Sequence, residues 1–348
     1  MSTLRVVQIG CGYWGPNVLR NLAAHPQVEL AGVVDIDPDI RAWLAVHYPG
    51  VPFAPAFDVG LLDRWNAQAV VIATPATTHF SLAGQVVKSG RHCLVEKPLA
   101  MTAGECEELI NLAQASGVAL MPGHTFLYNA AVTKMKKIIQ SGELGEIYYA
   151  HAQRLNLGRI RQDVDVVWNL APHDISILLY WFGKSPTRVA ARGATFIQPG
   201  IPDIAFLDLE FPDGQYASIH VSWLDPHKTR RITLVGSKKM AVYDDVAENK
   251  LTIYDKGVDR AHPEKATLGR FEDFGTFQLR LRGGGVTIPP IDFIEPLRVE
   301  VAEFVSAIHE GREPLTNGAS GLQTVLVLEA ASRSMEQNGQ FVKVEDSF

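Results

Sequence analysis

Short apolar runs rich in Val and Ile alternate with longer amphipathic segments along the first 124 residues. Strands that are apolar on both faces and separated by helices are typical of a parallel sheet covered on both sides. We therefore predict a doubly wound α/β domain over residues 1–124. Its expected strands are Leu4–Ile9, Leu30–Val34, Ala69–Ala73, Cys93–Val95 and Val118–Met121. Its expected helices are Trp14–Ala24, Pro38–His47, Phe80–Ser89 and Ala103–Ser116, the last capped by Thr102.

The pattern changes after residue 124, where alternating polar and apolar positions recur between turn signals such as Pro212-Asp213-Gly214. This density of strands predicts an α+β domain over residues 125–348, with a large, open, mainly antiparallel sheet. Its expected strands are Ile147–Ala152, Arg188–Ile197, Ala205–Phe211, Tyr216–Trp223, Arg231–Val235, Leu251–Tyr254 and Phe341–Val344. Its expected helices are Ala131–Ser141, Ala171–Phe182, Pro296–Glu310 and Gly321–Gln337.

Composition and charge narrow the class of protein. With 348 residues the chain is long enough for two domains. Its 32 Lys and Arg against 38 Asp and Glu give a net charge of −6, which provides no field for gathering nucleic acid or an anionic membrane. No apolar run approaches the ~18 residues of a membrane helix. The three cysteines form no CxxC pair, so we expect a soluble, cytoplasmic protein without disulfides.

A glycine-rich motif, Gly10-Cys11-Gly12-Tyr13-Trp14-Gly15, follows the first strand and opens the first helix. In a G-x-G-x-x-G turn the glycines permit the tight bend, the approach of a pyrophosphate and close helix packing, while free N–H groups bind the anion. Asp35 ends the second strand, where a carboxylate accepts both ribose hydroxyls and repels a 2′-phosphate. The alternative role for Asp35 is to start the turn before Pro38. The motif predicts dinucleotide binding, with NAD favoured over NADP.

Two further segments lie at strand ends, where a doubly wound sheet binds its ligand: Ala73–His79 and Val95–Leu99. The glycine motif with Asp35, the Ala-Thr-Pro turn that ends in His79, and Glu96-Lys97-Pro98 together resemble the Gfo/Idh/MocA oxidoreductase family, over nearly the whole chain. The resemblance implies a Rossmann domain joined to an open-sheet domain, Lys97 at the active site and a cis peptide before Pro98. Expected cofactor contacts are Gly10, Gly12, Tyr13, Trp14, Gly15, Asp35, Ile36, Thr74, Pro75, His79, Glu96 and Lys97.

Oxidation of a secondary alcohol requires a group that takes the hydroxyl proton and a donor that stabilises the developing alkoxide. Lys97 and His173 suit these tasks. His173 follows Pro172, and because proline is tolerated in the first turn of a helix, we expect His173 near a helix start. Asn169 lies four residues earlier, where relatives often carry Asp; it completes the expected catalytic set but cannot accept a proton. For Asp174 we favour a stabilising role at the helix N-terminus over support of His173.

A basic segment, Arg154-Leu155-Asn156-Leu157-Gly158-Arg159-Ile160-Arg161, leads towards this edge. Guanidinium groups form forked pairs with phosphate and carboxylate, although a solvated loop or a subunit contact would explain the segment equally well. Arg230 and Arg231 are weaker candidates, and if they alternate in a strand at most one faces the site. Expected substrate contacts are Tyr128, Arg154, Asn156, Arg159, Arg161, Trp168, Asn169 and His173.

These observations favour an NAD-dependent dehydrogenase that oxidises a sugar hydroxyl, in a subgroup resembling nucleotide-sugar 3-dehydrogenases such as those acting on a UDP-N-acetylhexosamine at C3. The alternatives are a free-sugar or inositol dehydrogenase, an NAD-assisted glycosidase without net redox change, and a non-catalytic dinucleotide-binding regulator. No metal site is expected, because the histidines form no ligand pair and Lys97 can neutralise an alkoxide. We expect a homo-oligomer, dimer or tetramer, assembled through the C-terminal sheet.

Overall fold

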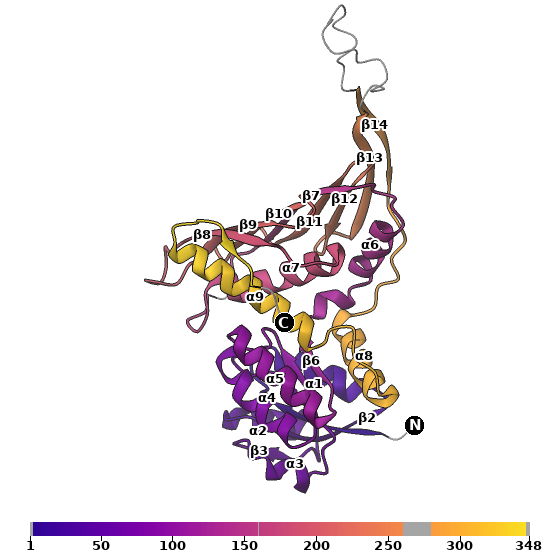
Figure 1. The fold of residues 1–348 in the computed structure, drawn as a ribbon. Helices are drawn as coiled ribbons and strands as arrows, with labels where there is room; N and C mark the ends of the chain where they lie inside the picture. The colour runs from indigo at the N-terminus through magenta and orange to yellow at the C-terminus, as the bar shows by residue number, and fades with distance from the viewer. Residues whose placement is uncertain (1–2, 159, 260–279, 346–348) are drawn as a thin grey trace, which may run out of the picture.

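The computed structural model describes residues 3–158, 160–259 and 280–345 and has two lobes (Figure 1). The first lobe is built on a parallel sheet of six strands in the order β3-β2-β1-β4-β5-β6. This order reverses between β1 and β4, and in such sheets ligands bind outside the carboxyl ends of the strands at the reversal. The prediction of a doubly wound sheet is confirmed. The strands are β1 (Leu4–Ile9), β2 (Val28–Val34), β3 (Phe53–Ala54), β4 (Ala69–Ile72), β5 (His92–Glu96) and β6 (Leu120–Gly123).

Local signals fix the helices of this lobe. Thr102 and Glu105 form a capping box at the start of one helix, and Gly117 ends it in the left-handed conformation. Asp37 caps another by accepting a bond from the Asp39 N–H. The helices are α1 (Gly15–Ala24), α2 (Pro38–His47), α3 (Gly60–Arg64), α4 (His79–Lys88) and α5 (Ala103–Ser116), with a 3-10 turn η1 (Ala76–Thr78) before α4.

The second lobe contains a nine-stranded sheet in the order β14-β13-β12-β11-β7-β10-β9-β8-β15. Only β7 and β10 pair in parallel within it, as far as the structure describes the chain, so the expected mainly antiparallel sheet is confirmed. The strands are β7 (Ile147–Leu155), β8 (Arg188–Ala194), β9 (Ile204–Glu210), β10 (Tyr216–Ser222), β11 (Thr229–Gly236), β12 (Met240–Asp244), β13 (Leu251–Asp259), β14 (Arg280–Thr287) and β15 (Val342–Lys343).

Helices α6 (Ala130–Gln140), α7 (Val166–Phe182) and α9 (Gly318–Glu336) lie on one face of this sheet, the face towards the first lobe (Figure 1). The 3-10 turn η2 (Thr125–Tyr128) links β6 to α6. Strand β8 ends at Ala194, three residues before the expected end, because the Asp203 carboxylate accepts the N–H groups of Phe196 and Ile197 and bends the chain. Sequence patterns did not predict the short elements β3 and α3, nor β12 and β14.

Helix α7 begins at Val166, earlier than expected, and Pro172 lies inside it. The Asp165 carboxylate accepts the Trp168 N–H and thereby starts the helix. Pro172 cannot donate to the carbonyl one turn earlier, yet most of the helix is buried against the sheet, and this burial offsets the missing bond. The prediction that His173 lies near a helix start is therefore wrong. Asn169 lies in the first turn of α7, and His173 lies one turn later.

The last helices of the sequence return to the first lobe. Helix α8 (Pro296–Glu310) inserts Leu297, Val301 and Phe304 into the apolar cluster that also contains Val6 and Leu22. Helix α9 contacts α5 and β6 of the first lobe and α7 and β8 of the second. Helix α9 therefore packs against both lobes and joins them. Among the described residues, no helix is long and apolar enough to cross a membrane.

Candidate active site

The glycine motif forms an open cradle at the end of β1. Gly10 has φ +88°, and a Cβ there would lie 2.5 Å from the Ala73 carbonyl oxygen. A Cβ on Gly15 would lie 2.7 Å from the Gly10 carbonyl oxygen, so neither position accepts a larger residue. Nothing lies within 4 Å of a Cβ built on Gly12. This open space next to the N-terminus of α1 fits the pyrophosphate of a dinucleotide.

Asp35 and three exposed apolar side chains surround the cradle. The Asp35 carboxylate accepts the backbone N–H groups of Cys11 and Asp37, which anchors it at the end of β2. Tyr13 and Ile36 are more than four-fifths exposed, and Trp14 is partly exposed. Exposed apolar side chains grouped in this way are typical of a ligand surface. Positions expected to contact the cofactor therefore line one open region.

Trp14 connects the cradle to β5. Its indole N–H donates to Glu96 Oε1 at 2.8 Å, and the Glu96 side chain packs against Gly123 at the end of β6. The Lys97–Pro98 peptide bond is cis, as the family resemblance implied. Burial raises the pKa of the Glu96 carboxyl, while the neighbouring Lys97 ammonium lowers it. Glu96 is thus an internal link between the cradle and the lysine.

The residues of the turn after β4 differ in how accessible they are to a cofactor. Pro75 is exposed, and Thr74 lies against Gly10 while its hydroxyl bonds to that of Thr78 at 2.6 Å. His79 is only 1% exposed, and its ring nitrogens face the carbonyl oxygens of Pro98 at 2.7 Å and Thr74 at 3.0 Å. A buried imidazole held in this way connects two turns. The expectation that His79 contacts the cofactor is therefore not supported by its position.

Lys97 reaches from the first lobe to α7. Its Nζ donates to the main-chain oxygen of Asn169 at 2.9 Å. Burial lowers the pKa of Lys97 to about 8, with Glu96 opposing the shift and Arg161 and Arg154 reinforcing it. Lys97 is therefore mainly protonated at pH 7 and loses its proton as the pH rises through about 8.

His173 lies close enough to Lys97 to feel its charge. Its Nδ1 is buried without a hydrogen-bond partner among the described residues, while the residue as a whole is partly exposed. Burial lowers the pKa of His173 well below its usual range, and the charges of Lys97, Arg154 and Arg230 lower it further. The imidazole is therefore neutral at pH 7 and able to accept a proton. Its ring meets the edge of Phe126, with centroids 4.9 Å apart.

Asn169 holds two partners at once. Its Oδ1 accepts the indole N–H of Trp223 at 3.0 Å, while its main-chain oxygen receives Lys97. A carboxylate could accept the Trp223 bond equally well, but only the amide adds N–H donors. The main-chain oxygen of Asn169 therefore orients Lys97, and the bond from Trp223 fixes its side chain.

Arg154 is buried in an ion pair. Its guanidinium forms two bonds with the Asp174 carboxylate, at 2.8 and 2.9 Å, and the two side chains are 4% and 1% exposed. The pair fastens β7 to α7. One expectation is corrected here: Asp174 is a buried ion-pair partner rather than a group at a helix start. Arg154, which we expected to bind substrate, has two of its nitrogens bonded to Asp174.

The other expected substrate contacts of the basic segment are Asn156, Arg159 and Arg161. Arg161 is about one-third exposed, pairs with Asp163 at 2.8 Å and is close enough to lower the pKa of Lys97. Asn156 is partly exposed, and its main-chain N–H donates to Ser222. Arg159 lies outside the described residues. Of this segment, Arg161 is thus the arginine that the structure leaves partly accessible near Lys97.

Two predicted substrate contacts are internal. The Tyr128 hydroxyl bonds to Thr316 at 2.8 Å, and the Trp168 indole N–H donates to Ser332 on α9 at 3.0 Å. Both side chains are buried, Tyr128 at 5% and Trp168 at 9% exposure. Their aromatic surfaces fill the joint between the lobes. The polar atoms of both side chains are therefore engaged within the protein, and their predicted contact with substrate stays a prediction.

Sequence reasoning missed polar groups that follow β6. His124 is 1% exposed, and both its ring nitrogens lack partners in the described part of the chain. Burial, reinforced by the charge of Lys97, lowers its pKa to about 4. Thr125 donates at 2.7 Å to Glu300, a buried carboxyl on α8. The signal was available, because His124 follows a strand end at the same edge as Lys97.

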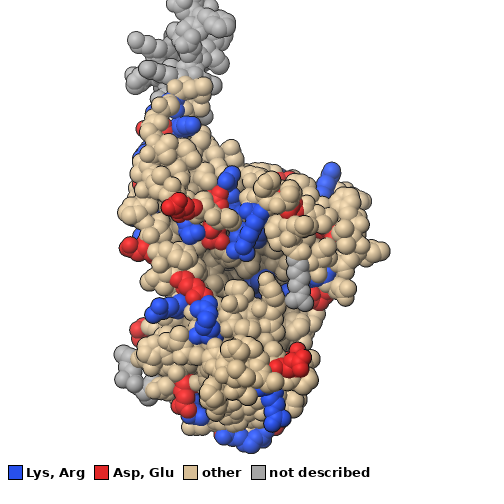
Figure 2. Space-filling view, turned by 180° about the vertical axis from the view of Figure 1, so that it is seen from behind, with Lys and Arg blue, Asp and Glu red and all other residues tan. Residues whose placement is uncertain are grey.

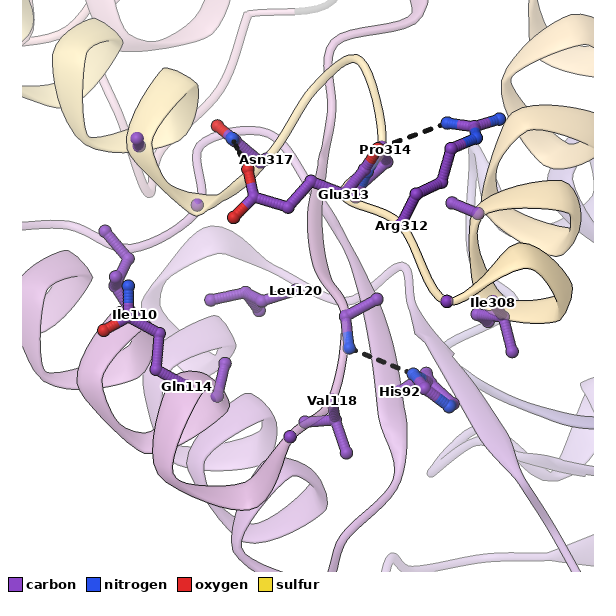
Figure 3. Close-up of a pocket in the computed structure, with 17 residues that line it drawn as sticks. His92, Ile110, Gln114, Val118, Leu120, Ile308, Arg312, Glu313, Pro314 and Asn317 are labelled. Carbon is purple, nitrogen blue, oxygen red and sulfur yellow. Dashed lines mark hydrogen bonds between the residues drawn. The ribbon is translucent and has the colours of Figure 1, made fainter.

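The candidate site lies where the lobes meet, because Lys97 of the first lobe bonds to Asn169 on α7 of the second. Figure 2 shows the face opposite that of Figure 1, where Lys and Arg side chains lie on both lobes beside Asp and Glu side chains. A separate cavity of about 310 Å³ opens at the other edge of the sheet, near His92 and Leu120, which begin β5 and β6 (Figure 3). It is therefore remote from Lys97. Within the described ranges no three His, Cys, Asp or Glu side chains are grouped to hold a metal.

A glycine cradle with an acidic strand end, next to a lysine and a neutral histidine, defines a dinucleotide-dependent oxidoreductase. Residues 4–124 match the family described as "Oxidoreductase family, NAD-binding Rossmann fold", and residues 132–242 match the "GFO/IDH/MocA C-terminal domain". The protein belongs to the GFO/IDH/MocA family of oxidoreductases. The family resemblance in the sequence is thus confirmed.

Individual relatives carry more specific names. The chain is 31% identical over 258 residues to the UDP-N-acetylglucosamine 3-dehydrogenase of Acidithiobacillus ferrooxidans, covering 74% of this chain and 79% of the relative. The solved structure of UDP-N-acetylglucosamine 3-dehydrogenase GnnA from the same organism matches with TM-score 0.79 and 25% identity, over 97% of this chain and 99% of that one. The myo-inositol 2-dehydrogenase of Thermotoga maritima is 24% identical over 357 residues and 99% of each chain.

Proposed function

We propose that this protein is an NAD-dependent dehydrogenase that oxidises a secondary hydroxyl of a nucleotide sugar, such as C3 of a UDP-N-acetylhexosamine. The observation that carries the proposal is the bond from Lys97 Nζ to the main chain of α7, one turn from His173. Glu96, which precedes Lys97, bonds to Trp14 of the glycine motif. The similarity to a UDP-N-acetylglucosamine 3-dehydrogenase supports the substrate class.

In this proposal, His173 and Lys97 have different roles in handling the substrate proton. His173 is neutral at pH 7 because burial lowers its pKa, so Nε2 accepts the hydroxyl proton of the substrate. Lys97, largely protonated below its pKa of about 8, donates a hydrogen bond to the same oxygen and stabilises the developing alkoxide. When bound, the nicotinamide accepts the hydride. The main-chain oxygen of Asn169 orients Lys97, and its side-chain amide contributes a donor to a neighbouring hydroxyl.

The cofactor preference follows from Asp35. Its carboxylate is anchored by two backbone N–H groups at the end of β2, where the ribose of a dinucleotide lies in this fold. A 2′-phosphate would bring negative charge against this group. We therefore assign NAD rather than NADP as the cofactor, with Gly10, Gly12 and Gly15 forming the pyrophosphate cradle.

The open face of the large sheet supports assembly of identical chains. Tyr149, Phe206 and Tyr216 are exposed on it, and Phe206 stacks on His220 with centroids 4.2 Å apart. No helix covers this face in Figure 1. We assign it as the subunit contact of a dimer or tetramer, since aromatic side chains are enriched in such contacts.

The function is tested by measuring NAD and NADP reduction with UDP-N-acetylglucosamine, other UDP-sugars, free hexoses and inositols. UDP-sugars with NAD should give the highest kcat/KM. Lys97→Ala and His173→Ala should each lower kcat by about 10²–10⁴-fold and leave NAD affinity near normal. Lys137→Ala, which removes an exposed lysine on α6, is the control and should behave like the wild type.

Faster turnover of inositol or glucose than of any UDP-sugar would contradict the nucleotide-sugar proposal. It would favour a free-sugar or inositol dehydrogenase, which the similarity to a myo-inositol 2-dehydrogenase makes the second candidate. Product formation without release of NADH would instead indicate the cycle without net redox change.

A further inference from the structure

Two adjacent arginines of β11 lie on opposite faces of the large sheet. Arg230 pairs in register with Arg154 of β7, and residues directly opposite each other in an antiparallel ladder point to the same face. The Arg154 side chain bonds to Asp174 on α7, so this is the face that carries the site. Arg231 points the other way and pairs with Asp244 at 2.7 Å. Strand geometry therefore selects Arg230 over its neighbour.

Arg230 and His173 share one aromatic neighbour. The guanidinium carbon of Arg230 lies 5.5 Å from the centroid of the Phe126 ring, and the edge of that ring meets the His173 imidazole. Arg154 lies over the same ring at 4.5 Å. The charge of Arg230 is also one of those that lower the pKa of His173. Of the two arginines whose charges lower the pKa of His173, Arg230 is therefore the one that is partly exposed.

The accessibility of the two guanidinium groups differs. The Arg154 side chain is 4% exposed and occupied by Asp174, whereas the Arg230 side chain is 36% exposed. Arg230 uses Nη1 to bond Asp245 Oδ2 at 3.2 Å, and its other N–H groups have no partner among the described residues. Asp245 is itself held by Asn129 at 3.1 Å. The guanidinium is thus fixed at one corner and has donors left for a ligand.

We propose that Arg230 binds an oxyanion of the substrate, a phosphate or a carboxylate, and so determines which sugars the site accepts. This inference rests on the proposed function and specifies how that site would recognise its substrate. A guanidinium matches both anions through paired N–H donors, and the shared contact with Phe126 keeps that anion near the oxidised carbon. A neutral sugar has no group that would use this charge.

The test compares Arg230→Ala with Arg231→Ala, a matched control that removes the same side chain from the opposite face. KM and kcat are measured for UDP-N-acetylglucosamine, N-acetylglucosamine 1-phosphate, glucuronate and N-acetylglucosamine. For the charged substrate that the wild type uses best, Arg230→Ala should raise KM about 10- to 100-fold with little change in kcat. Arg231→Ala should leave KM unchanged, and neither change should affect the neutral sugar.

The other measurements separate the possible sources of failure. Arg230→Lys keeps the charge and the Asp245 pair but loses the fork, so an intermediate KM is expected, together with normal NAD affinity as a sign of correct folding. Preference for the two phosphorylated sugars identifies a phosphate, and preference for glucuronate identifies a carboxylate. Equal KM values for the two alanine variants, with UDP-N-acetylglucosamine still oxidised, would overturn the role of Arg230 alone. A wild type that prefers the neutral sugar would overturn both proposals.

Discussion

Both positive and negative charges lie near Lys97. Burial is the main cause that lowers its pKa to about 8; Glu96 raises that pKa, and Arg161 and Arg154 lower it. Because the ammonium form is the one that stabilises an alkoxide, activity should decline as the pH rises through this value. The pH dependence of kcat/KM therefore reports directly on the charges around one side chain.

Two substitutions should move this decline in opposite directions. Glu96→Gln removes a negative charge but keeps an oxygen for the Trp14 indole N–H, so the pKa of Lys97 falls and activity is lost at lower pH. Arg161→Gln removes a positive charge, so the pKa rises and activity persists to higher pH. Each shift should be about 0.5–1 pH unit for a neighbouring charge that is partly screened. The measurement is kcat/KM from pH 6 to 10.

A shift in the same direction for both variants would show that another group controls the alkaline limb. Arg231→Gln, on the opposite face of the large sheet, is the control and should leave the profile where the wild type has it.

At the scale of elements, the ion pair of Arg154 and Asp174 joins a strand to the helix that carries His173. Arg154→Met leaves a buried carboxylate without its partner, which should lower the free energy of unfolding by about 3–5 kcal/mol. Chemical denaturation measures this loss. Arg231→Met, which breaks a partly exposed pair with Asp244, should cost less, about 1 kcal/mol.

The double variant Arg154→Met, Asp174→Leu removes both charges and should recover part of the lost stability. If Arg154→Met instead retained wild-type stability and lost only substrate affinity, the assignment of Arg154 to the fold would be wrong.

The elements differ in how far the sequence predicts them. The strands of the first sheet are mostly apolar because helices cover both faces, so the β1 and β4 to β6 segments stand out as runs. The start of α7 could not be read from Pro172, because burial of the whole helix outweighs one missing hydrogen bond. Propensity rules describe a helix in isolation and do not include that burial.

The residues of the candidate site also differ in how far the sequence predicts their roles. Lys97 and His173 were predicted, and the structure brings their segments together. The role of Arg154 depends on Asp174, twenty residues away on another element, and no local pattern encodes that contact. The position of His124 and Phe126 directly after β6 would have predicted that they lie at the site. Neither side chain carries a fixed charge, and charge was the signal that selected Lys97 and the arginines.

At the scale of the whole molecule, Glu300 buries a carboxyl where α8 meets the first lobe. Burial, and then the nearby Glu96, raise the pKa of Glu300 well above its usual range. The folded protein therefore holds a proton that the unfolded chain releases above a pKa of about 4.3. This contribution to stability is fully present below that value and is lost as the pH rises towards the folded pKa.

Glu300→Gln keeps the shape and removes the titration. Its Tm should depend less on pH between 5 and 8 than that of the wild type, and at pH 8 it should equal or exceed the wild-type Tm. Glu303→Gln is the matched control on the same helix: the bond to Arg312 lowers the pKa of Glu303, so this variant should be less stable at pH 7 and approach the wild type in acid. Identical pH slopes for wild type and Glu300→Gln would contradict the assignment.

The insertion of α8 into the first lobe limits how this protein can be dissected. A fragment that stopped after β6 would contain all six strands of the parallel sheet, yet it would leave Val6, Val18 and Leu22 without the cover of Val301 and Phe304. Exposed side chains of that kind promote aggregation. The cofactor-binding half is therefore not a removable cassette, and exchanging it between relatives would require carrying along a helix encoded about 170 residues downstream.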